Sequence, residues 1–173
     1  IISTDNLRED FTLKITPIIK NEKLKRMDKY IQHGNTSTLE HCIAVSYISY
    51  CIARKFHIRC DYNSLLRGSL LHDYFLYDWH DRDAAHKWHG FHHAAVALKN
   101  ASKDFELTDI EMDIIAKHMF PLNIKLPRYH KVIDKNVLDS LNEELDKHFG
   151  DFVMDVYSLI NSKDIAEYLR EIH

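Results

Sequence analysis

Glycine and proline are scarce in this sequence, with four and three residues respectively among 173. Sheet proteins normally separate their strands by turns rich in these residues, and no alternating strand pattern bounded by turn residues occurs here. Only two segments resemble loops, residues 77–90 and 121–129. The sequence therefore predicts an all-α fold.

Cysteine is also scarce, with three residues, Cys42, Cys51 and Cys60. Cys42 and Cys51 are nine residues apart on one predicted helix, a rise of roughly 13 Å that no disulfide spans. We therefore expect reduced thiols. No segment approaches the roughly 20 apolar residues of a membrane span, and the amino terminus lacks a basic segment followed by an apolar one. A cytoplasmic protein without membrane contact is expected.

Positive charge is not in excess, because the net charge is −3 with neutral histidine. This balance gives no basic surface for nucleic acid, so no nucleic-acid partner is expected. Hydrophobic residues make up 45% of the chain and charged residues 28%, which is typical of a globular protein. At this length, residues 1–173 are predicted to form a single domain.

Histidines and aspartates occur in a suggestive order, each on a predicted helix. Neutral imidazole nitrogens and carboxylate oxygens are ligands for borderline divalent metals such as iron, manganese, cobalt, nickel and zinc. The candidate ligands are His41, His72, Asp73, His93, His118 and Asp134. Their order suggests a metal-dependent enzyme.

Helix-capping motifs place the first of these residues. Ser37 and Glu40 have the spacing of a capping box, which predicts that a helix begins near Ser37. The next helix has two possible caps, Asp61 and Asn63. In the first helix an apolar stripe follows His41, formed by Ala44, Val45, Ile48 and Ile52; in the second, Leu65, Leu66 and Ser69 precede His72 and Asp73. Both stripes are expected to face the core.

The later candidates follow the same helical spacing. His93 begins a face of small residues, Val96, Ala97 and Ala101. Thr108 and Glu111 form a second predicted capping box. Behind it, Ile110, Ile114, Ile115 and His118 are expected on the inner side, and Glu111, Asp113 and Lys117 on the outer side. Asp134 stands where the spacing of Val137, Leu138 and Leu141 would predict an apolar residue.

Buried carboxylates make the metal hypothesis stronger than ordinary core packing. A single histidine on an apolar face is more often a hydrogen-bonded core residue than a ligand. Burying unpaired carboxylates costs several kcal/mol, however, and a divalent ion beside Asp73 and Asp134 would compensate for it. Four imidazoles and two carboxylates are many for one ion and few for two, so the number of ions stays open.

The segment from Thr38 to Leu138 resembles the HD superfamily of metal-dependent phosphohydrolases, named for a doublet such as His72-Asp73. The resemblance implies an HD-domain helical bundle with a core of about residues 38–141, packed terminal helices and a metal site between core helices. By this resemblance His41, the doublet and Asp134 would hold a first metal. His93 and His118 resemble the extra histidines of dinuclear branches, which favours two ions bridged by Asp73.

Three histidines, His89, His92 and His93, lie so close together that spacing does not choose among them. We prefer His93 as the ligand because it is in phase with Val96 and Ala97. His89 would then stand at the rim of the site, where it, His80 or His86 could protonate a leaving oxygen.

The resemblance implies hydrolysis of a small phosphate ester or nucleotide by a metal-activated water, with iron or manganese favoured and magnesium, cobalt, nickel or zinc also accepted. Asp73 could accept the proton of that water, or bulk water could do so instead, because a carboxylate that bridges two metals is a weak base. The candidates for binding substrate phosphate are Lys135, Arg128, Arg82 and Lys87. The alternative function is a non-catalytic module that senses a nucleotide or another signal. The closing helices could also form a homodimer.

Overall fold

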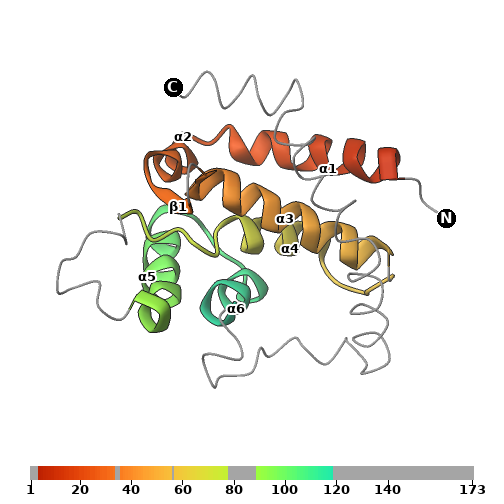
Figure 1. Cartoon of the computed structure of the whole chain (residues 1–173). Helices are drawn as coiled ribbons and strands as arrows, with labels where there is room; N and C mark the ends of the chain where they lie inside the picture. The colour runs from red at the N-terminus through yellow and green to blue at the C-terminus, as the bar shows by residue number, and fades with distance from the viewer. Residues whose placement is uncertain (1–3, 34–35, 56, 78–88, 119–173) are drawn as a thin grey trace.

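The computed structural model describes residues 4–33, 36–55, 57–77 and 89–118, and helices dominate them (Figure 1). The elements are α1 (Thr4–Ile19), α2 (Glu22–Lys25), the 3-10 helix η1 (Arg26–Lys29), β1 (Ile31–His33), β2 (Thr36–Ser37), α3 (Thr38–Lys55), α4 (Tyr62–Leu70), α5 (His89–Asp104) and α6 (Asp109–Lys117). The all-α prediction is confirmed. No helix in these ranges combines the length and the apolar character needed to cross a membrane.

A short hairpin that the sequence analysis did not predict leads into α3. Its strands β1 and β2 are antiparallel and pair Ile31 with Ser37. The hydroxyl of Ser37 accepts a hydrogen bond from the Glu40 amide at 3.2 Å, and the Glu40 carboxylate accepts one from the Ser37 amide at 2.8 Å. The Ser37 hydroxyl also donates to buried Asp28 at 2.6 Å. The first predicted capping box is therefore confirmed, and it anchors η1 to the start of α3.

Helix α3 is the central element of the bundle, with α1 beside it and α4 packed against it (Figure 1). Its buried apolar face consists of Leu39, Cys42, Ile43, Tyr47 and Tyr50, and also Cys51 and Ala53. The predicted stripe was wrong, because Ala44, Val45, Ile48 and Ile52 are only half-buried. Since α3 is covered by other helices on more than one side, its buried face is wide and is filled by tyrosines rather than by the smaller apolar residues.

The core continues from α3 into helix α1. Four residues of α1 are buried at helical spacing, Leu7, Phe11, Ile15 and Ile19. The ring of Phe11 meets that of Tyr47 edge-on, with centroids 5.0 Å apart. One apolar cluster includes buried residues from α1, α2, η1, α3, α4, α5 and α6. The single domain over residues 1–173 stays a prediction, because much of the carboxyl-terminal part lies outside the described residues.

Helix α4 packs closely on α6. Of the two predicted caps, Asp61 is the one used: its carboxylate accepts from the amides of Asn63 at 3.0 Å and Ser64 at 3.4 Å. Gly68 faces Ile114, and a Cβ atom on this glycine would lie 2.8 Å from Cδ1 of Ile114 and 3.0 Å from its Cβ. The absence of a side chain at Gly68 therefore sets how closely the two helices approach.

Helix α6 begins with the second capping box, in which the Thr108 and Glu111 side chains bond reciprocally to backbone amides, as predicted. The predicted division of its faces was wrong, because Glu111 and Asp113 are buried. Glu111 forms an ion pair with Arg67 of α4 at 3.1 Å, and Asp113 pairs with Lys117 on its own helix. These partners compensate the cost of burying the two carboxylates, so both acidic residues can occupy buried positions on α6.

Candidate metal centre

The His72-Asp73 doublet lies in a turn directly after α4. Helix α4 ends at Leu70, with Leu71 as its cap. The Phe75 amide donates to the Asp73 carbonyl at 2.8 Å, and Leu76 has a left-handed backbone with φ of 56°. The prediction that each candidate lies on a helix was therefore wrong for the doublet. Neighbours on a helix point about 100° apart, and the turn removes this constraint, so both side chains face one centre.

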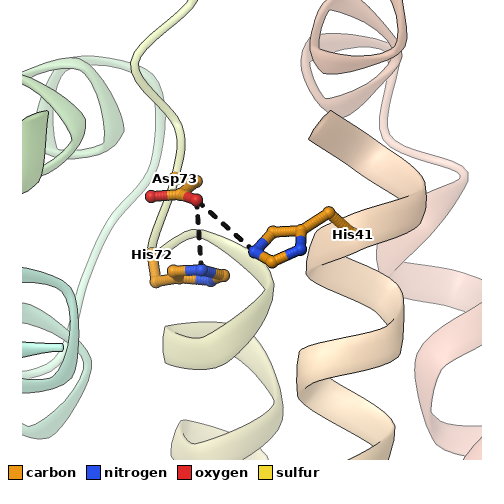
Figure 2. Close-up of side chains that lie close together, drawn as sticks. All are labelled: His41, His72 and Asp73. Atoms are coloured by element: carbon orange, nitrogen blue, oxygen red, sulfur yellow. Dashed lines mark ion pairs between the residues drawn. The ribbon is translucent and has the colours of Figure 1, made fainter. Parts of the chain in front are cut away.

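One oxygen of Asp73 faces a first pair of histidines, as Figure 2 shows. Oδ2 lies 3.3 Å from Nε2 of His72 and 3.6 Å from Nε2 of His41 on α3. Donor atoms of these three residues all lie within 4.8 Å of one another. The Asp73 and His72 side chains are buried, whereas that of His41 is 28% exposed. Among these three residues, His41 is the one in contact with solvent.

The other oxygen of Asp73 faces a second pair of histidines. Oδ1 lies 3.3 Å from Nε2 of His93 on α5 and 3.4 Å from Nε2 of His118, which caps the end of α6. The two Nε2 atoms are 2.8 Å apart. Asp73 thus stands between two groups of nitrogen donors, with a different oxygen directed to each.

Backbone carbonyls fix the ring orientation in one histidine of each pair. Nδ1 of His72 donates to the Ser69 carbonyl at 2.6 Å, and Nδ1 of His118 donates to the Ile115 carbonyl at 2.9 Å. A carbonyl only accepts, so each Nδ1 carries hydrogen and the neutral ring has its lone pair on Nε2, which faces Asp73. Metal-bound histidines use the same arrangement. Apolar spacing does not predict these acceptors, and their one sequence signal is a histidine three residues after the carbonyl near a helix end.

The electrostatics of the centre favour an ionised carboxylate. Burial raises the pKa of Asp73. When Nε2 of His118 and of His72 also carries hydrogen and the rings are positively charged, their hydrogen bonds and charges lower it further, and the pKa then lies well below its ordinary value. Burial lowers the pKa of His72, yet the neighbouring Cys42 and Asp73 raise it above its ordinary value. The buried anion thus requires positive charge nearby, from protons or from a cation.

The donor set fits a divalent ion in each group. Atoms bonded to one ion at about 2.1 Å lie about 3.0–3.4 Å apart in octahedral or tetrahedral geometry. The distances from Asp73 to the four histidines are 3.3 to 3.6 Å. Nitrogen with oxygen donors suits iron, manganese, zinc and related ions. Each of the two groups therefore offers donors that suit a divalent ion.

Five of the six predicted ligand residues thus lie together in two groups that share Asp73. The sixth, Asp134, lies outside the described residues, as do the phosphate-binding candidates Arg82, Lys87, Arg128 and Lys135. His89 is the first residue of α5, and His92 lies one turn further, but their side chains are not described. The roles predicted for these residues stay predictions.

Comparison with known proteins gives one result that bears on this centre. A family model described as HD domain matches residues 38–168, which is well over half of the chain. No curated protein and no solved structure matches. The family match begins at the first residue of α3 and includes both groups of donor residues.

Proposed function

Because the chain belongs to the HD-domain family, we propose that it is a metal-dependent phosphohydrolase that acts on a small phosphate ester or nucleotide. The family match and the histidine-aspartate cluster together indicate binding of a divalent metal. The observation that carries the proposal is the position of Asp73, whose two oxygens face two different pairs of histidines.

The proposal assigns two ions to the two groups. His41, His72 and Asp73 would hold the first, with Asp134 as a further ligand. Asp73, His93 and His118 would hold the second. Iron or manganese is the preferred metal for this mixture of nitrogen and oxygen donors, and magnesium, cobalt, nickel or zinc are also accepted.

Two bound ions would supply an activated water and would offset the charge that develops on the phosphoryl group. The chain's own residues would hold this arrangement. Asp73 would act as a bridging ligand, and a carboxylate with cations on both sides is a weak base, so the water's proton would pass to solvent. His72 and His118 would keep their orientation through the Ser69 and Ile115 carbonyls.

Substrate would approach from the side of His41, because this histidine is more exposed than His72 or His118. The phosphate would be held by cations among Arg82, Lys87, Arg128 and Lys135. His89, at the start of α5, would protonate the leaving oxygen.

The experiment pairs elemental analysis of protein purified without chelator with turnover of a panel of phosphate esters and nucleotides under added manganese or iron. The variants are Asp73→Asn and His118→Ala. The control is His57→Asn, an exposed histidine with φ of 51°, a backbone conformation that asparagine tolerates.

We expect about two metals per chain in the wild-type protein and the control. Asp73→Asn should lose both metals, and His118→Ala should lose one. Turnover should fall by at least about 100-fold in both variants, since loss of even an outer partner of a metal ligand reduces activity about 10–100-fold. Metal without any turnover would favour the nucleotide-sensing alternative. A protein that takes up no metal under any loading condition would contradict the proposal.

A further inference from the structure

Asn100 of α5 bonds to the turn that carries the doublet. Its side-chain amide donates to the carbonyl of Phe75 at 2.9 Å and to the carbonyl of Tyr74 at 3.3 Å. Because both partners can only accept, the orientation of the amide is determined by the contacts. Tyr74 and Phe75 are buried and directly follow Asp73, so Asn100 supplies partners for two carbonyls of a buried turn.

The same face of α5 carries one of the candidate metal ligands. His93, Ala97, Asn100 and Asp104 follow the helical spacing of three and four residues. His93 and Asn100 are two turns apart, a rise of about 10.5 Å. The buried alanines at 97 and 101 on this face allow a close approach. One rigid helix therefore contacts both the second metal group and the doublet turn.

A second contact holds the same turn at the far end of α5. The hydroxyl of Tyr74 donates to the carboxylate of Asp104 at 2.9 Å, and Arg26 of η1 contacts both side chains. Burial raises the pKa of Tyr74 to about 12, so the hydroxyl stays protonated and can donate. Tyr74 is thus held to α5 through its backbone by Asn100 and through its side chain by Asp104.

Without the contacts from Asn100 and Asp104, the strained backbone of the doublet turn would relax. Leu76, next to the carbonyl that Asn100 binds, has φ of 56°, a conformation that is costly for a residue other than glycine. The ring of Phe75 meets the ring of His93 edge-on, with centroids 6.2 Å apart. A shift of this turn would therefore move Asp73 and Phe75 together relative to His93.

We propose that Asn100 is a positioning residue: it holds the doublet turn against α5 at the spacing that brings Oδ1 of Asp73 within 3.3 Å of Nε2 of His93. The part of the test that measures manganese binding rests on the proposed function. The first group, His41, His72 and Asp73, contains no residue of α5. Loss of Asn100 should therefore affect the two groups of donors differently.

The test compares Asn100→Ala and Asn100→Asp with Ser102→Ala. The aspartate keeps the shape of the side chain but turns the donor into an acceptor that repels the two carbonyls. Ser102 is an exposed residue of the same helix, and its truncation removes a polar group without these contacts. Amide hydrogen exchange is measured on metal-free protein, and manganese binding is measured by calorimetric titration.

In the metal-free variants of Asn100 we expect exchange at the Tyr74 and Phe75 amides to become at least about tenfold faster, since two buried carbonyls lose their donor. Exchange within α6 should be unchanged. The manganese ion that His118→Ala also loses should bind at least about tenfold less tightly in these variants, as when a partner of a metal site is lost. The other ion, and both ions in the Ser102 control, should change less than about threefold in affinity.

Unchanged exchange at Tyr74 and Phe75, or equal weakening of both ions, would overturn the assignment of Asn100. Faster exchange spread evenly over α3 to α6 would also overturn it, since this indicates general destabilisation. If the wild-type protein binds no manganese while exchange in the turn still rises in the variants, the proposed function fails and the assignment of Asn100 to the turn is supported.

Discussion

At the residue scale, the three cysteines differ in how accessible their thiols are. Cys42 is fully buried and Cys51 is 4% exposed, whereas Cys60 is exposed just before α4. Burial raises the pKa of Cys42, although the nearby His72 lowers it. Partial burial, together with the Asp61 carboxylate, raises the pKa of Cys60. A thiol reagent should therefore distinguish the three positions.

We predict that the native protein reacts with a disulfide reagent at one thiol per chain, and the denatured protein at three. The reaction at Cys60 should be slower near neutral pH than that of an unperturbed cysteine, because a raised pKa leaves less thiolate. Cys60→Ser should abolish the native reaction. Two or three reactive thiols in the folded protein would contradict the burial of Cys42 and Cys51.

Residue spacing predicted which side chains meet at the centre more fully than it predicted how they meet. His93 and His118 were recognisable because each stands in phase with apolar residues of its helix, whereas the apolar stripe that pointed to His41 is only half-buried. Spacing does not determine which oxygen of Asp73 faces which histidine, since this depends on how three other helices pack around the turn. Asn100 was missed, although a polar residue between Ala97 and Ala101 was a usable signal.

At the element scale, the cap of α4 provides a prediction with a defined pH dependence. Asp61→Ala should lower the free energy of unfolding by about 0.5–2 kcal/mol at pH 7, as is usual for a lost helix cap. The Ser64 hydroxyl and two backbone amides lower the pKa of Asp61 below its ordinary value of 3.8. Because the pKa is lower in the folded state, the carboxylate stabilises that state at pH values above the ordinary pKa. This stabilisation disappears as the pH falls through the folded-state pKa.

Urea unfolding at pH 7 and at a series of values below pH 4 measures this difference. The gap between the wild-type protein and Asp61→Ala should narrow as the carboxyl is protonated. Asp61→Asn is the matched control, because asparagine also caps helices but does not titrate in this range. A gap that stays constant down to pH 2 would show that the charge of Asp61 has no part in the cap.

The packing of α4 on α6 should be sensitive to a single methyl group at Gly68. Gly68→Ala gains about 0.8–1.0 kcal/mol of helix propensity but overpacks against Ile114, which typically costs about 1–3 kcal/mol. Rotation of Ile114 relieves the contact with Cδ1 but not that with Cβ at 3.0 Å. We therefore expect a net loss of about 0.5–2 kcal/mol in the free energy of unfolding.

A double-mutant cycle with Ile114→Ala tests this explanation, since contacting residues usually show coupling energies of about 0.5–3 kcal/mol. The loss caused by Gly68→Ala should be smaller in the Ile114→Ala background. An equal loss in both backgrounds would mean that the backbone of α4, rather than Ile114, opposes the new methyl group.

Helix existence and helix starts were largely predictable, whereas the buried faces were not. Ser37, Asp61 and Thr108 cap helices through bonds within a few residues, so local spacing contains the necessary information. The buried position of Glu111 depends on Arg67, 44 residues earlier in the chain. A pattern of apolar spacing assigns such a carboxylate to the solvent side, because it takes no account of a partner on another helix.

At the scale of the whole molecule, the donor residues come from distant parts of the chain. His41 and His118 lie on α3 and at the end of α6, and the folded core brings both to Asp73. Such a set of donors exists only in the folded state, so an ion that binds it stabilises the fold.

We predict that each manganese ion, at 100 times its dissociation constant, raises the free energy of unfolding by about 2.7 kcal/mol. For a protein of this size, this corresponds to a rise of roughly 5–10 °C in Tm for each ion, measurable by calorimetry. Chelator should reverse the shift, and Asp73→Asn should show none. An equal rise in Asp73→Asn would place the responsible ion elsewhere on the molecule.

Helix α1 determines where the amino-terminal boundary of an expressed fragment can lie. The family match starts at Thr38, but Phe11 and Ile15 are fully buried, and Phe11 packs on Tyr47. A fragment trimmed to residues 38–168 would lack Phe11, which packs on Tyr47 and Tyr50, and would expose these two tyrosines to solvent. Exposed aromatic surface of this kind promotes self-association. The region that resembles the family is therefore smaller than the unit that must be expressed, and sedimentation of the fragment beside the full chain would reveal the difference as aggregation.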